Sequence, residues 1–243
     1  METIATPRIV PMHRRLQHPI RNRTWPCRQS RDVMTESIEA PLDCQVRERP
    51  CMVVLTEDLG FYNGTSWRSC FGRLFPKHYG IQFCYMQLKG LTLLKTGLAQ
   101  MEQDLASQMN VVLVAKGPLV SWLAQYYLES LPLSGLVMVD PIEITHNSAA
   151  GLKLLYPPDA TEQQLLDSIC RGHNDRPLLL EPGILPMLVL TTRKDFVHNA
   201  SWIASRHSDP AGEFGKFEVT EVEGASNNEV TNLIHCWIDE KVL

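Results

Sequence analysis

The chain has 243 residues, of which 44% are hydrophobic, and carries a formal net charge of −4 at pH 7. This length suits a single domain with one hydrophobic core. The weak negative charge gives no electrostatic reason to expect nucleic acid or an anionic membrane as a partner. No apolar run reaches the ~20 residues needed to span a bilayer. We therefore expect a soluble protein without a membrane span.

The cysteines indicate a reducing compartment. All seven are scattered, and none forms a C-x-x-C pair, which favours free thiols in an intracellular protein over a disulfide framework. Zinc requires ligands at close spacing, and only Cys170 with His173 approaches it. One such pair commonly arises by chance, so we expect neither a metal nor a cofactor.

The N-terminal segment differs from the rest of the chain. Met1 to Arg31 contains seven arginines, four prolines, no lysine and one acidic residue. It has no periodic apolar face, which predicts a largely disordered segment. Three interpretations stay open: a mitochondrial or plastid targeting peptide, a basic arm that contacts anionic partners, and an untargeted terminus. We assign residues 1–48 to this extension and 49–243 to a single domain, and leave open whether residues 1–33 are cleaved.

Strand-like and helix-like patterns alternate along the domain. Apolar or alternating runs predict strands at 51–55, 81–88, 111–115, 135–140, 186–192 and 217–222. Apolar positions at helical spacing predict helices at 66–77, 94–109, 118–130 and 200–207, with a further helix from Thr161 and a final one capped by Ser226-x-x-Glu229. This order predicts an α/β fold with a mostly parallel sheet, helices on both faces, and ligands at the carboxyl ends of the strands.

Five segments in this order resemble those of the α/β-hydrolase superfamily. They are VVLTEDLGFYNGTSW, VVLVAKGPL, GLVMVDP, PMLVLTTRKDFV and FEVTEVEGASNNEV. The resemblance covers roughly three quarters of the chain. It implies an α/β-hydrolase-like domain in which the segment from Pro141 to Gly183 is a reduced lid.

The resemblance places the nucleophile at Gly117. The superfamily uses a G-x-S-x-G turn, where this chain reads Ala-Lys-Gly-Pro-Leu from Ala115 to Leu119. Glycine suits the strained backbone of that turn but cannot attack a substrate. The next residue normally donates its backbone N–H to the oxyanion hole, and here it is Pro118, which has no N–H. Both replacements suit the turn and remove a catalytic group.

The other catalytic positions follow the same trend. Thr56 and Glu57 stand where the oxyanion loop usually reads His-Gly, and a carboxylate there would oppose a developing oxyanion. The histidine position falls at Asn227, which cannot act as a general base near neutral pH. Asp195 alone matches the position of the catalytic acid.

A few residues could substitute for the missing groups. Cys70 is one, although we expect it to pack behind Phe71 as a small apolar residue. His146 follows the strand at 135–140 and is the histidine best placed to face the cleft. Ser121 lies one helical turn after Gly117, where its hydroxyl is expected to bond a backbone carbonyl.

Three functions are consistent with this pattern. The first is a pseudoenzyme that has lost the serine, histidine and oxyanion machinery and binds a small apolar ligand or a protein partner. The second is an esterase-like hydrolase that works without a serine and uses Asp195 with His146 or His198. The third is a scaffold or complex subunit that docks through the basic N-terminal arm.

Overall fold

The computed structural model describes residues 33–38, 50–57, 65–79, 81–88, 94–108, 110–141, 185–194, 203 and 217–243. The helices predicted from Thr161 and at 200–207, together with most of the reduced lid, lie outside these residues, apart from Ile203. All statements below concern the described part of the chain.

The described strands form one seven-stranded sheet in the order β1-β3-β2-β4-β5-β6-β7. The strands are β1 (Val33–Ile38), β2 (Cys51–Glu57), β3 (Phe83–Leu88), β4 (Val111–Lys116), β5 (Gly135–Val139), β6 (Met187–Thr191) and β7 (Phe217–Glu221). Every pair is parallel except β1 with β3. The predicted mostly parallel α/β sheet is therefore confirmed.

Strand β1 corrects the predicted start of the sheet. It pairs with β3 from Val33↔Leu88 to Ile38↔Phe83, inside the segment 1–48 that we assigned to the N-terminal extension. Its sequence, VMTESI, has three consecutive polar residues in the middle, and the strand lies at the edge of the sheet. An antiparallel edge strand needs no continuous apolar run, so it lacked the signal by which the buried strands were found.

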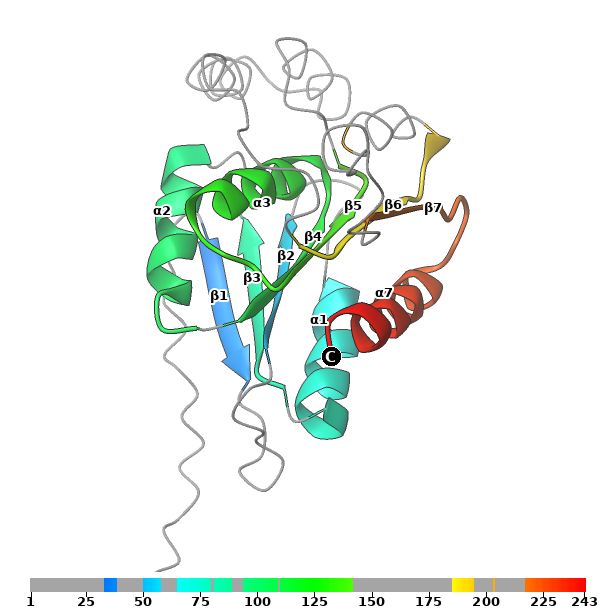
Figure 1. Cartoon of the computed structure of the whole chain (residues 1–243), viewed down its shortest axis with the longest axis horizontal. Helices are drawn as coiled ribbons and strands as arrows, with labels where there is room; N and C mark the ends of the chain where they lie inside the picture. Colours follow the sequence, from blue (N-terminus) through cyan, green and yellow to red (C-terminus); the bar gives the residue numbers. More distant parts are fainter. Residues whose placement is uncertain are drawn as a thin grey trace, which may run out of the picture.

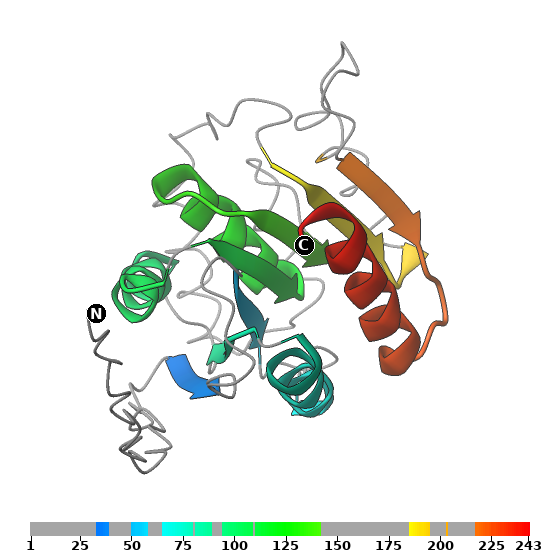
Figure 2. The same ribbon diagram turned by 60° about the horizontal axis from the view of Figure 1, so that its bottom comes forward.

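Helices cover both faces of the sheet. Figure 1 shows α2 (Leu94–Leu105) and α3 (Pro118–Ser130) on one face, with α1 (Thr65–Leu74) and α7 (Asn227–Lys241) on the other. A π-helical turn, Phe75–Tyr79, extends α1. Figure 2 shows α1 and α7 side by side, and the two helices contact each other directly. This arrangement brings the start of α7 to the carboxyl end of the central strands.

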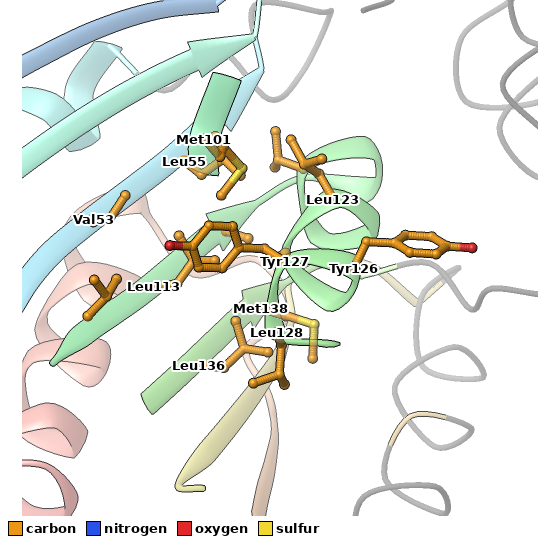
Figure 3. Packing of buried hydrophobic residues seen from close by; sticks show 14 of the residues in the cluster. Val53, Leu55, Met101, Leu113, Leu123, Tyr126, Tyr127, Leu128, Leu136 and Met138 are labelled. Carbon is orange, nitrogen blue, oxygen red and sulfur yellow. The ribbon is translucent and has the colours of Figure 1, made fainter. Parts of the chain in front are cut away.

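Strands β2, β4, β5 and β6 are buried on both faces, and the core is divided into two clusters. Figure 3 shows the first, where Tyr127 of α3 points toward Leu113 of β4 while Tyr126 points away from the sheet. The second cluster packs Trp67 and Phe71 of α1 against α7. Burial on both faces explains why these strands read as continuous apolar runs.

Local sequence features explain where α3 and α7 begin, near the carboxyl ends of the strands. Helix α3 begins with Pro118 at its first position, where a missing N–H leaves no helical bond unmade. Helix α7 begins with the predicted capping box: the backbone N–H of Ser226 donates to Glu229 Oε2 at 2.7 Å, and Ser226 Oγ accepts from Glu229 N at 3.4 Å. Both helix starts are thereby fixed relative to the sheet.

Candidate functional site

The sharpest turn beside the central strands lies at Gly117, between β4 and α3. Its φ of 117° and ψ of 162° fall in a region that residues with a side chain rarely adopt. Its N–H donates to Val139 O of β5 at 2.9 Å, and its carbonyl accepts from Ser121 N at 3.0 Å. These bonds hold the turn against both the neighbouring strand and the first turn of α3.

Glu57 occupies the space beside this turn. A Cβ atom placed on Gly117 would lie 2.7 Å from Glu57 Cδ and 3.0 Å from Glu57 Cγ, with Oε1 closer still. Glu57 ends β2 and is fully buried. The turn and the carboxyl group therefore share one packed site, in which no side chain at position 117 fits without displacing Glu57.

Thr56 and Glu57 are strand residues rather than parts of a loop, which corrects the sequence interpretation. Thr56 Oγ1 lies 2.8 Å from the hydroxyl oxygen of Tyr85 on β3, within hydrogen-bonding distance. Consecutive strand residues point to opposite faces, so Glu57 turns to the other side, toward Gly117. From the sequence, the Glu57 carboxylate was expected to face a developing oxyanion. In the structure it lies directly against the turn at Gly117.

Asn227 lies beside the same turn, on the face of the sheet opposite to Glu57. Its Oδ1 accepts one hydrogen bond from Lys116 Nζ at 2.9 Å and another from Trp67 Nε1 at 3.3 Å. Lys116 directly precedes Gly117, and Asn227 is the first residue of α7. The amide oxygen is thus shared by a cation from β4 and an indole from α1.

Lys116 is a site residue that sequence reasoning passed over. Its side chain is only 7% exposed, and Nζ lies 4.7 Å from the centre of the Trp67 ring. Burial lowers the pKa of Lys116, and the negative charge of Asp140 partly opposes that shift. The signal available was a lysine ending the apolar run VVLVAK, where a buried strand would otherwise continue.

Asp140, which directly follows β5, is the second residue that was missed. It is 2% exposed and has a positive φ of 51°. Its carboxylate accepts from Thr192 N at 2.7 Å and from Thr192 Oγ1 at 2.5 Å. Burial raises the pKa of Asp140, while the hydrogen bonds from Thr192 oppose the rise. The bonds join the ends of β5 and β6, so the residue has a structural role at the edge of the site.

Solved structures share the fold of this chain over most of their length. The α/β-hydrolase domain-containing protein 10 from mouse superposes with a TM-score of 0.57 and 12% identity, over 86% of this chain and 92% of that one. A proline iminopeptidase-related protein from Thermus thermophilus gives 0.53 and 13%, over 86% and 94%. An α/β-hydrolase enzyme from the metagenome of lagoon sediments at Mar Chica, Morocco, gives 0.53 and 12%, over 86% and 95%. The chain has the α/β-hydrolase fold.

At this level of identity the α/β-hydrolase likeness extends to the fold alone. No protein-family model and no curated protein matches the sequence. Gly117, where the sequence resemblance placed the nucleophile, lies in the turn between β4 and α3. The structure brings Gly117, Pro118, Glu57 and Asn227 to one edge of the sheet.

The other sequence candidates have different outcomes. Asp195, His146 and His198 lie outside the described residues. Cys70 is a half-buried free thiol whose Sγ lies 3.7 Å from Asn228 Oδ1. Position 70 falls at the margin of the α1 face that buries Trp67 and Phe71, next to α7.

Ser121 is fully buried in α3, and its Oγ forms no hydrogen bond within the described structure. The prediction that its hydroxyl bonds a backbone carbonyl is therefore wrong.

Among the described side chains, no group of three or more histidine, cysteine, aspartate or glutamate residues could hold a metal ion. None of the described helices combines the length and apolar character that crossing a membrane requires.

Proposed function

We propose that this α/β-hydrolase-fold protein lacks serine-hydrolase chemistry and acts by binding a small apolar ligand or a protein partner. The proposal rests chiefly on the contact between Glu57 and Gly117. A nucleophile at position 117 needs a side chain that projects from the turn, and the Glu57 carboxyl group fills that space. A chain that merely lost its serine would leave the space open to substrate.

Two further features support this proposal. Pro118 follows the turn and has no N–H to donate to an oxyanion, and losing one such donor costs about 2.7–4 kcal/mol in serine hydrolases. Asn227 stands at the histidine position, and its amide oxygen already accepts from Lys116 and Trp67. An amide cannot accept and return a proton near neutral pH, so it cannot replace the general base.

The hydrophobic packing near the carboxyl ends of the strands supports a binding role. Both core clusters are fully formed up to the carboxyl ends of the strands, the edge at which α/β sheets bind ligands. A protein that keeps the scaffold and loses the reactive groups retains a surface for recognition. A ligand that binds only the folded state raises Tm with its concentration. A titration of medium-chain fatty acids against Tm therefore tests the apolar-ligand form of the proposal, with no rise expected for matched short-chain carboxylates.

The second candidate function is a hydrolase with displaced machinery built on Asp195 with His146 or His198. A panel of chromogenic esters of increasing chain length separates it from the first. We expect no turnover above that of buffer containing a heat-denatured sample. Turnover that disappears in a folded Asp195→Ala variant, and persists in a matched Asp104→Ala variant on α2, would establish the displaced enzyme instead.

The basic N-terminal segment bears on the partner form of the proposal. A variant lacking residues 1–32 retains β1 and every other described strand. If the full chain enters an organelle and this variant does not, the result would support a targeting role for residues 1–32. Loss of a stable complex with unchanged location would support docking through the basic arm.

A further inference from the structure

Glu57 is the charged residue on an otherwise apolar side of β2. The residues that share this side, Cys51, Val53 and Leu55, belong to the first core cluster. Glu57 itself is fully buried at the carboxyl end of the strand. Burying a carboxyl group costs free energy that an apolar side chain of similar size would not cost. The need to fill the space beside Gly117 therefore does not by itself account for a glutamate at this position.

The Glu57 side chain closes the end of an apolar row between β2 and β4. In the parallel ladder of these strands, Leu55 is aligned with Ala115, and both residues are fully buried in the first core cluster. Residues two apart on a strand face the same side, so Leu55 is the next side chain inward from Glu57. The Glu57 carboxyl group lies between this row and the carboxyl edge of the sheet, where ligands of α/β proteins bind.

Two positions compete for the Glu57 carboxyl group. Packing against the Gly117 turn favours the inner position that the structure shows. Solvation favours an outer one, which is within reach because Glu57 is the last residue of its strand at the edge of the sheet. Asp140 provides a fixed comparison at the same edge, since two hydrogen bonds from Thr192 hold its carboxylate.

We propose that Glu57 is a reversible plug, which covers the apolar row at Leu55 and Ala115 when it lies against Gly117 and uncovers the row when it turns outward. This proposal rests on the binding function proposed above and adds how access to that site is controlled. The group that enters is small, because it takes the place of one glutamate side chain. It is also apolar, since Leu55 and Ala115 lie next to that place. The methyl end of an unbranched alkyl chain meets both conditions.

The plug should weaken ligand binding by the fraction of time for which it is open. A minor state is commonly populated at about 0.1–10%, and the apparent affinity falls in the same proportion. Glu57→Ala is permanently open, so we expect it to bind octanoate at least about tenfold more tightly than the wild type in a calorimetric titration. Glu57→Met is the matched control, because its unbranched apolar side chain has no carboxyl group that water would draw outward. It should bind octanoate no more tightly than the wild type.

The movement of Glu57 can be measured in the unaltered full chain without a ligand. Carbodiimide coupling to glycinamide, followed by peptide mass spectrometry, gives the rate at which each carboxyl group is modified. Glu57 should react at about 0.1–10% of the rate of Glu221, which is exposed. It should also react faster than Asp140. Static exposure predicts the opposite order, because Asp140 is 2% exposed and Glu57 is fully buried.

The two measurements separate failure of the plug from failure of the proposed function. Glu57 modified no faster than Asp140 would show a fixed side chain and overturn the plug. Octanoate binding that is equal in the wild type and Glu57→Ala would also overturn it, while leaving the proposed binding function intact. If neither protein binds octanoate, the apolar-ligand form of the proposed function fails, and the modification rates still decide whether Glu57 moves.

Discussion

The side chain of Glu57 occupies the space into which a side chain at Gly117 would project. These two residues are 60 positions apart in the sequence, and the pairing of β2 with β4 brings them together. Thr56 is aligned with Lys116 in the parallel ladder, so the next residue of each strand, Glu57 and Gly117, meet at its end. This register makes the turn dependent on glycine for two reasons, backbone strain and lack of space.

The first prediction concerns alanine at position 117. Gly117→Ala should destabilise the protein by about 1–3 kcal/mol through backbone strain, with about 1–3 kcal/mol more through overpacking against Glu57. Gly224→Ala is the matched control, because its φ is +73° and a Cβ there meets no atom within 4 Å. Urea unfolding should give a clearly larger loss of unfolding free energy for Gly117→Ala than for Gly224→Ala. Equal losses would show that Glu57 leaves room at the turn.

The second prediction separates strain from the Glu57 contact by a double-mutant cycle. Glu57→Ala removes the atoms that a Cβ at position 117 would meet. In that background, Gly117→Ala should keep only its backbone-strain cost of about 1–3 kcal/mol, so the two substitutions should couple by about 0.5–3 kcal/mol. The four unfolding free energies measure this coupling directly. Additive effects would mean that the two side-chain positions are independent.

The third prediction follows from the lowered pKa of Lys116. Its pKa is below 10.5 in the folded protein and near 10.5 in the unfolded chain, so between these values the unfolded state binds more protons. Unfolding free energy should therefore rise with pH across this interval relative to a Lys116→Met variant. Burial raises the pKa of Cys51 and Tyr127 to about 12, which acts in the opposite direction. Both groups are present in the variant, so the difference between the two proteins isolates Lys116.

Denaturant titrations at several pH values from 7 to 10.5 provide this difference. If the difference in unfolding free energy stays constant with pH, or falls, folding does not lower the pKa of Lys116.

Much of the architecture was predictable because buried parallel strands leave a strong signal. CMVVL and VVLVA are continuous apolar runs, and the structure places them as adjacent central strands. The capping box at Ser226 likewise depends only on residues within one turn. In each case the cause of the structure lies within a few residues of the sequence.

The missed features depend on contacts between distant segments. From the sequence, Lys116 is simply the polar end of a strand. Its role becomes visible only through its contacts with Asn227 of α7 and Trp67 of α1. From the sequence, Glu57 looks like a loop residue. The register of β2 with β4 places it next to Gly117. Neither periodicity nor spacing contains that information, because each relationship is created by packing between elements.

The central claim is that no reactive serine exists at this site, and fluorophosphonate labelling tests it most directly. The folded wild-type chain is incubated with the probe, and its intact mass is measured beside that of an active serine hydrolase. The account predicts an unchanged mass, because Gly117 has no nucleophile and Glu57 fills its place. A stoichiometric mass increase that maps to a serine, such as Ser121, and disappears on unfolding would contradict it.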